Sequence, residues 1–245
     1  MTLHRFQGFR PEAITFLENL RKHNNRPWFQ AHKDIYENVV KAPLGELILR
    51  IGEAFRRFAP EMVADPRISL YRIYRDTRFS RDKSPYKTQV AAVFPVRGLP
   101  KNSGPGLYFH FSPDEVLIGG GIYMPEPHLL RAVRERIAAR PRDFLAILEA
   151  RSFRSTFGEL EGERLVTMPK GFASDSAAAE YLRYKQFLFA REFPATIATT
   201  PRLESRILDC FEKGMLLIRF LQKPAFKSLA VSRAREISHL PDTLR

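Results

Sequence analysis

Apolar residues in the first sixty positions recur every three or four residues, which is the period of an α-helix. The pattern runs through residues 11–23, 27–40 and 43–58, and each stretch begins at or next to a proline. Proline is well tolerated in the first turn of a helix, so these prolines mark the expected starts. The sequence therefore predicts three N-terminal helices, the third with a broad apolar face that is expected to be buried.

The period then changes from helical to alternating. Residues 68–76 are rich in β-branched and aromatic side chains, and residues 88–96, 106–112 and 115–124 continue in the same manner. Such runs are typical of strands, and the Ser-Pro-Asp-Glu turn at 112–115 is typical of a hairpin. We expect an antiparallel sheet of about four strands within residues 68–123.

Helical periodicity returns after the strands. Residues 129–139, 141–150, 176–190 and 201–222 are expected to be helices. Helices, then strands, then helices indicate an α+β fold in which N-terminal and C-terminal helices pack on one sheet. Residues 6–222 are predicted to be a single domain, and residues 223–245 a basic, partly disordered C-terminal tail.

Length and composition limit the class of protein. No apolar run approaches the roughly 18 residues that a membrane helix requires, and the N-terminus lacks the apolar core of a signal peptide. The one cysteine, Cys210, excludes a framework of disulfides within the chain. We therefore expect a cytoplasmic protein without a membrane partner.

Basic residues outnumber acidic ones, with 40 Lys and Arg against 27 Asp and Glu, a net charge of +13. Such a charge attracts polyanions, so nucleic acid is a possible partner. A GC-rich coding sequence would also raise the arginine content without any such partner. The excess is densest in residues 67–101, whereas residues 126–222 are nearly balanced.

The densest basic segment is residues 72–88. Its cations lie too close together for its two carboxylates, Asp76 and Asp82, to offset all of their repulsion. A bound phosphate or carboxylate would offset the remainder, and arginine offers the planar fork suited to it. We therefore expect an anionic small molecule to bind here, and the predicted anion-binding residues are Arg72, Arg75, Arg78, Lys83 and Lys87.

Other interpretations of this segment remain open. If the protein is an enzyme, Asp76 or Asp82 is the candidate acid or base. If it is a non-catalytic scaffold, the same residues form an internal Arg–Asp network. If it is a nucleic-acid-binding module, the aromatic residues between the cations would stack on bases. The sequence specifies no reaction, cofactor or oligomeric state.

Six further residues are candidates for an additional pocket. The aromatic and basic pair Trp28 and Arg26 lies at a helix restart, His110 lies in a strand, and Gly120 lies within a run of three glycines; the set is Arg26, Trp28, Lys33, Tyr86, His110 and Gly120. The glycine run also fits a bulge or a close approach of another segment. The six histidines form no H-x-x-x-H or H-E-x-x-H pair, so no metal site is expected.

The motif R-I-Y-R-D-T-R-F-S-x-D-K-x-P-Y-K-T, residues 72–88, resembles the signature of the family named domain of unknown function 2461. Residues 24–29 resemble the N-N-R-x-W-F motif of that family, and residues 119–127 its G-G-G-x-x-M-P-x-P segment. Similarity extends over residues 6–222, with later landmarks at 153–158, 161–162 and 169–172. The resemblance implies one family domain and no particular reaction.

Overall fold

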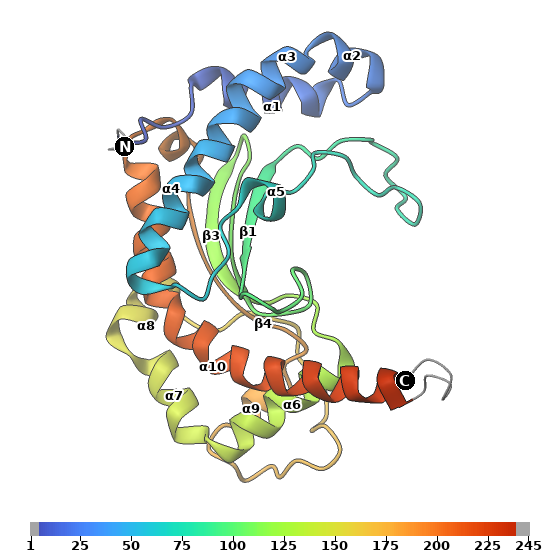
Figure 1. Cartoon of the computed structure of the whole chain (residues 1–245), viewed down its shortest axis with the longest axis vertical. Helices are drawn as coiled ribbons and strands as arrows, with labels where there is room; N and C mark the ends of the chain where they lie inside the picture. Colours follow the sequence, from blue (N-terminus) through green and yellow to red (C-terminus); the bar gives the residue numbers. More distant parts are fainter. Residues whose placement is uncertain (1–4, 239–245) are drawn as a thin grey trace. The chain divides into compact units, whose positions relative to one another are not determined.

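The computed structural model describes the backbone of residues 5–238 and the side chains of residues 5–230. The fold is α+β with a four-stranded antiparallel sheet, as predicted (Figure 1). The strands follow one another in the sheet in chain order: β1 (Val90–Pro95), β2 (Gly106–Phe111), β3 (Glu115–Ile122) and β4 (Phe187–Pro194).

The N-terminal segment is helical, as its periodicity predicts. Asn25 begins the second helix by accepting a hydrogen bond from the backbone N–H of Trp28, which satisfies one donor of the first turn. The elements are α1 (Pro11–Lys22), α2 (Arg26–Ala31), α3 (Lys33–Ile35), the π-helical stretch η1 (Tyr36–Lys41) and α4 (Ala42–Phe58). Pro43 has no backbone N–H to donate, and it lies in the first turn of α4, directly after η1.

The predicted strand at 68–76 is wrong. Asp65 caps a short helix, α5 (Pro66–Ser69), and the chain beyond it makes only the isolated bridges Leu70–Ala92 and Tyr74–Tyr86. The β-branched and aromatic residues of 68–76 are typical of a strand. The sequence does not show whether another strand pairs with them along their full length, and none of the described strands does.

The fourth strand comes instead from a segment that was predicted to be helical, residues 176–190. Only α9 (Ala179–Leu182) is helical there, and β4 begins at Phe187. Phe187 and Phe189 are buried while Leu188 and Ala190 are half-buried, which is the alternation of a strand. The neighbouring alanines and leucines favoured a helix in the sequence, and pairing in the sheet overrides that preference.

The remaining C-terminal elements are α6 (Pro127–Ala139), α7 (Pro141–Glu149), α8 (Arg151–Phe157), the 3-10 helix η2 (Ala195–Thr199) and α10 (Arg202–Ser238). Residues 223–238 continue α10, and the predicted division between a domain ending at residue 222 and a basic, partly disordered tail stays a prediction. The rest of that predicted tail, residues 239–245, lies outside the described residues. No helix that the structure describes is long and apolar enough to cross a bilayer.

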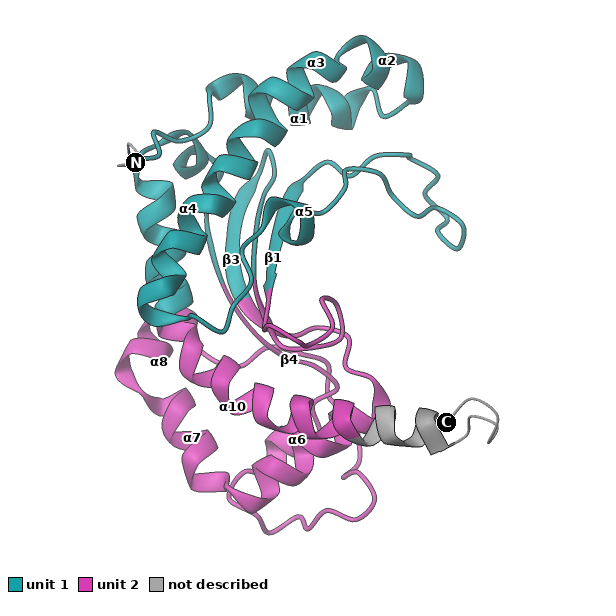
Figure 2. Cartoon of the chain, in the orientation of Figure 1, with its two compact units in different colours: residues 1–94, 108–119, 191–212 teal, residues 95–107, 120–190, 213–245 magenta. Residues whose placement is uncertain are grey.

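The chain divides into two compact units, each built from three segments (Figure 2). Unit 1 comprises residues 1–94, 108–119 and 191–212, and unit 2 comprises residues 95–107, 120–190 and 213–245. All four strands have residues in both units. The predicted single domain over residues 6–222 stays a prediction.

Each unit has its own aromatic core. In unit 1, Phe55 packs on Phe94 and Phe211 with ring centroids 5.5 and 6.1 Å apart. In unit 2, Phe189 packs on Phe157 at 4.6 Å, and a side chain at Gly214 would collide with the Phe189 ring. Burying aromatic rings of this size is the main favourable contribution to folding of such units.

Candidate functional site

The basic signature forms an arm of unit 1 whose second side runs into the start of β1 (Figure 1). We call residues 70–75 and 85–92 the stem of the arm and residues 76–84 its tip. Three backbone hydrogen bonds of 2.8–3.0 Å join the two sides of the stem: Tyr71 N–H to Ala91, Lys87 N–H to Ile73 and Arg75 N–H to Pro85. The arm is therefore a hairpin with sparse pairing.

The stem is attached to the N-terminal helices through Asn24. Its amide accepts a hydrogen bond from the backbone N–H of Tyr86 and donates one to the Tyr86 carbonyl, each 3.0 Å long. The Tyr86 ring is 1% exposed and stacks on Phe29 at a centroid distance of 4.1 Å. Two distant sequence motifs, residues 24–29 and the signature, thus meet in one packed contact.

The carboxylates of the signature are occupied by arginines of the same arm. Asp76 receives two hydrogen bonds from the Arg78 guanidinium, at 3.0 and 2.7 Å. Asp82 pairs with Arg75 and also accepts the Ser84 N–H at 2.9 Å. The bonds from Arg78 lower the pKa of Asp76 to about 2, and those from Ser84 and Arg75 lower the pKa of Asp82 further still. Both groups are carboxylates at neutral pH, and neither is poised as an acid.

The tip exposes an aromatic ring among cations. Phe79 is 94% exposed, and the Arg78 guanidinium carbon lies 5.6 Å from its ring centroid. Arg81 and Lys83 are exposed beside it, although the Lys83 ammonium donates to the Thr77 carbonyl at 3.0 Å. A large apolar ring that is so exposed contributes little to folding.

Two cations of the stem, Arg72 and Lys87, make no salt bridge within the described residues. The Lys87 ammonium donates to the Arg72 carbonyl at 3.2 Å and lies 5.2 Å from the centroid of the Tyr71 ring. Partial burial and, secondly, the charge of Arg72 lower the pKa of Lys87. Arg72 is exposed and its charge also helps to lower the pKa of Asp76, so Lys87 is the member of this pair that is partly removed from water.

The stem cations adjoin a polar face of the sheet in unit 1. The Tyr71 ring lies 6.5 Å from that of Tyr108 on β2, and the Tyr108 hydroxyl lies 3.1 Å from Nδ1 of His110. His110 is 7% exposed, and its Nε2 lies 3.3 Å from the Glu115 carboxylate. Burial lowers the pKa of His110, and the hydrogen bond that the imidazole donates to Glu115 opposes that effect only in part.

Sequence reasoning named His110 but missed Tyr108 and Glu115. Successive side chains of a strand point to opposite faces, so Tyr108 and His110 share one face while Phe109 and Phe111 share the other. Phe109 and Phe111 are fully buried, whereas Tyr108 is half-buried. The alternation of polar and apolar residues from Tyr108 to Phe111 is present in the sequence, and it identifies the polar face once this segment is known to be a strand.

The predicted residues of the second helix lie in unit 1 with the arm. Arg26 is exposed, and its charge counters part of the rise in the pKa of Tyr86 that burial causes. Lys33 is exposed. Trp28 is half-buried and stacks on His32 at 4.1 Å, so its ring already has a partner.

Gly120 does not belong to the same unit as the other five candidate pocket residues. It belongs to unit 2, where a Cβ atom would lie 2.8 Å from the Gly106 carbonyl oxygen and 2.8 Å from the Phe189 ring. Gly121 has φ +126°, and a Cβ atom there would meet the Phe187 backbone at 1.9 Å. The glycines thus allow β3 to approach its neighbours closely.

Among the described residues, no three His, Cys, Asp or Glu side chains are grouped as metal ligands. Comparison with curated proteins gave no match. The family model described as conserved hypothetical protein (DUF2461) matches residues 12–220, which is most of the chain and includes the arm, the Asn24 motif and the polar sheet face. The chain belongs to the DUF2461 family.

Proposed function

We propose that the protein binds a small anion, such as a phosphorylated metabolite, where the stem cations meet the polar sheet face of unit 1. The observation that carries the proposal is the pair Arg72 and Lys87. Two like charges are held side by side, while the carboxylates of the arm are bound by other arginines.

The physical reason is electrostatic. A partly buried ammonium next to a second cation is destabilised by desolvation and by repulsion, and both effects lower the pKa of Lys87. A phosphate or carboxylate bound between the two groups would reverse both effects. Arg72 supplies a bidentate fork for such an oxyanion and Lys87 a point charge.

Beyond the anion, the remainder of the ligand would extend along Tyr71 and Tyr108 toward His110. Burial lowers the pKa of His110, which favours the neutral imidazole. The Tyr108 hydroxyl and the Glu115 carboxylate hold the imidazole in place. If the bound molecule is turned over, we propose that the Tyr108 hydroxyl takes a proton from it while passing its own proton to His110 Nδ1, so that His110 is the base in place of Asp76 and Asp82.

Isothermal titration calorimetry with orthophosphate, glucose 6-phosphate and adenosine monophosphate tests this proposal. Binding of one of them is expected to weaken about 10- to 100-fold in Arg72→Gln and in Lys87→Gln, because each loses a charged hydrogen bond. Arg81→Gln is the matched control, since it removes an exposed cation of the tip and should leave affinity unchanged. Equal affinity in all four proteins, or no binding to wild type, overturns the proposal.

A second candidate function rests on Phe79. We propose that the tip binds single-stranded nucleic acid, with a base stacked on the exposed ring and phosphates near Arg81 and Lys83. Stacking on an aromatic ring contributes about 1–3 kcal/mol per base, so Phe79→Ala should weaken binding of a labelled oligonucleotide about 5- to 150-fold. Fluorescence anisotropy at two salt concentrations measures this affinity. An affinity that changes neither with Phe79→Ala nor with salt refutes the second candidate function.

A further inference from the structure

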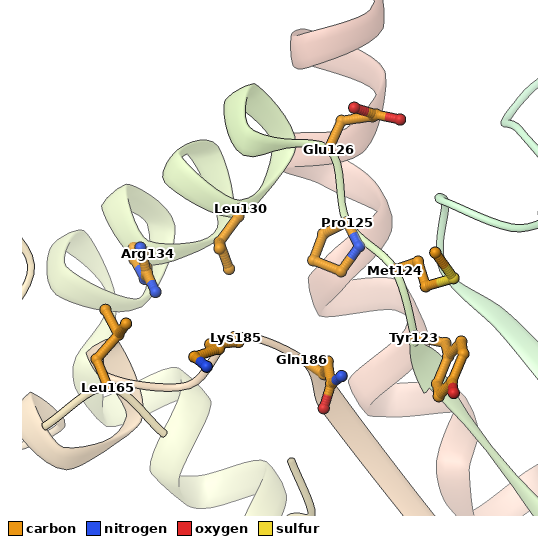
Figure 3. Close-up of a pocket in the computed structure, with 9 residues that line it drawn as sticks. All are labelled: Tyr123, Met124, Pro125, Glu126, Leu130, Arg134, Leu165, Lys185 and Gln186. Carbon is orange, nitrogen blue, oxygen red and sulfur yellow. The ribbon is translucent and has the colours of Figure 1, made fainter. Parts of the chain in front are cut away.

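A pocket of about 560 Å³, open to the surface, lies within unit 2, remote in sequence from the basic arm (Figure 3); it is called the cavity below. Most of its wall is apolar, and its polar groups come from the segment between β3 and α6, from α6 itself and from the segment that leads into β4. The lining residues are Tyr123, Met124, Pro125, Glu126, Leu130, Arg134, Leu165, Lys185 and Gln186. Part of this wall is the Met-Pro-Glu-Pro segment, to which the sequence assigned no role.

Arg134 is the unusual member of this wall. Only 9% of its surface is exposed, yet it makes no salt bridge within the described residues. Its Nη2 donates to the Tyr184 carbonyl at 2.9 Å, and its Nε is buried without a hydrogen-bond partner. Burial is the cause that lowers the pKa of this guanidinium. A buried charge without a counterion is costly, and proteins normally pair it.

The other charged groups of the cavity do not provide that counterion. Figure 3 shows Arg134 projecting from α6 toward the segment that carries Lys185 and Gln186, while the Glu126 carboxylate points away from both cations. Lys185 adds a second positive charge, and its own partner is Glu163, at 3.0 Å, outside the cavity wall. That pair is largely exposed, so it contributes little and leaves Lys185 able to turn toward a ligand.

We propose that this cavity binds an organic anion with an apolar body, whose carboxylate or phosphate is held by Arg134 and Lys185. The planar guanidinium suits either oxyanion. The apolar body would lie against Met124, Leu130 and Leu165, because small-molecule sites are mostly apolar with a few placed polar groups. The site does not depend on the function proposed for unit 1.

The test uses the full chain and three probes: phenylacetate, benzyl phosphate and the neutral alcohol 2-phenylethanol. Fluorinated forms of the three are followed by ¹⁹F NMR line broadening, which reports binding directly. We expect at least one of the two anions to bind about 10- to 100-fold more tightly than the alcohol, because only an anion compensates the buried guanidinium. The comparison between carboxylate and phosphate identifies the oxyanion.

Arg134→Gln is expected to abolish the preference for the anion, and Lys185→Gln to reduce it. Arg131→Gln is the matched control, since Arg131 lies on the same helix but is exposed and paired with Glu135. If Arg134→Gln does not fold, as judged by circular dichroism, Leu165→Trp takes its place by filling the cavity and should block both anion and alcohol.

Three results overturn the proposal. One is that none of the probes binds to the wild-type protein. Another is that the alcohol binds as tightly as both anions. The third is that binding persists unchanged in Arg134→Gln and in Leu165→Trp. Binding to unit 1 alone is distinguished by Lys87→Gln, which should not affect these probes.

Discussion

The stem and the tip of the arm belong to one continuous signature, yet they contact the protein in different ways. The stem is held by Asn24, by the stacked ring of Tyr86 and by backbone hydrogen bonds. The tip pairs Asp76 with Arg78 within itself, joins Asp82 to Arg75 of the stem, and leaves Phe79 exposed. Charged residues that are close in sequence therefore have different structural roles, which depend on the other residues that they contact.

Exposed Arg–Asp pairs in the tip contribute little free energy, because water competes for both partners. Buried aromatic stacking in the stem contributes far more. The stem therefore fixes the position of Arg72 and Lys87, while the tip keeps its own shape through local pairing. Substitutions in the two regions are expected to separate stability from binding.

The largest expected effect is that of Tyr86→Ala. Removing a ring that is 1% exposed and stacked on Phe29 should lower the free energy of unfolding by about 3–5 kcal/mol. Urea denaturation followed by circular dichroism measures it. Phe79→Ala is the matched control in the tip and should change stability by less than about 0.5 kcal/mol. Similar losses in both variants would end the distinction between stem and tip.

Asn24→Ala is expected to come next, at about 1–3 kcal/mol, because it leaves the N–H and the carbonyl of Tyr86 without their partner. Hydrogen exchange of the Tyr86 amide should accelerate as well. Asn25→Ala serves as the control, since it removes only the cap of α2 and should not affect that amide. Unchanged exchange at Tyr86 in Asn24→Ala would contradict the proposed anchoring.

A smaller effect concerns pH. The pKa of His110 lies below its ordinary value of 6.5 in the folded protein, so the unfolded chain binds more protons just below that pH. Stability should therefore fall as pH decreases from 7 through 6.5, until the folded form is also protonated. His110→Gln should remove this part of the pH dependence in melting experiments from pH 7.5 to 5. A variant whose slope equals that of wild type would show that His110 is not the responsible group.

The smallest effect on stability is expected from Asp82→Asn in the tip. Its melting temperature at pH 7 should equal that of wild type, because the pair with Arg75 is exposed on the aspartate side. Trypsin should nevertheless cleave the tip faster, since Asp82 also holds the Ser84 N–H. Asp114→Asn, which removes another exposed pair of unit 1, is the control and should leave cleavage of the tip unchanged. A clear drop in melting temperature would mean that the tip contributes to the fold.

Much of this arrangement could be expected from the sequence, and particular residues show where expectation ended. The helices with prolines in the first turn were recognised because periodicity and start signals agree. Residues 68–76 were expected to be a strand and form only isolated bridges beyond α5, whereas residues 187–190 were expected to be helical and belong to β4. Strands require a partner whose position the local sequence does not state. The polar sheet face was recognised at His110, but Tyr108 and Glu115 were assigned only through their contacts with His110, the first along β2 and the second across the hairpin.

The sequence by itself determined the α+β class, most helices, the family and the high density of cations in residues 72–88. Those properties depend on residue types and on their local spacing, and both can be obtained directly from the sequence. Within the described residues, tertiary structure alone decided that Asp76 and Asp82 are paired with arginines, that Arg72 and Lys87 make no salt bridge, and that Arg134 is buried without one. The reason is physical: the free energy of a charge depends on its burial and on its nearest opposite charge, and folding sets both.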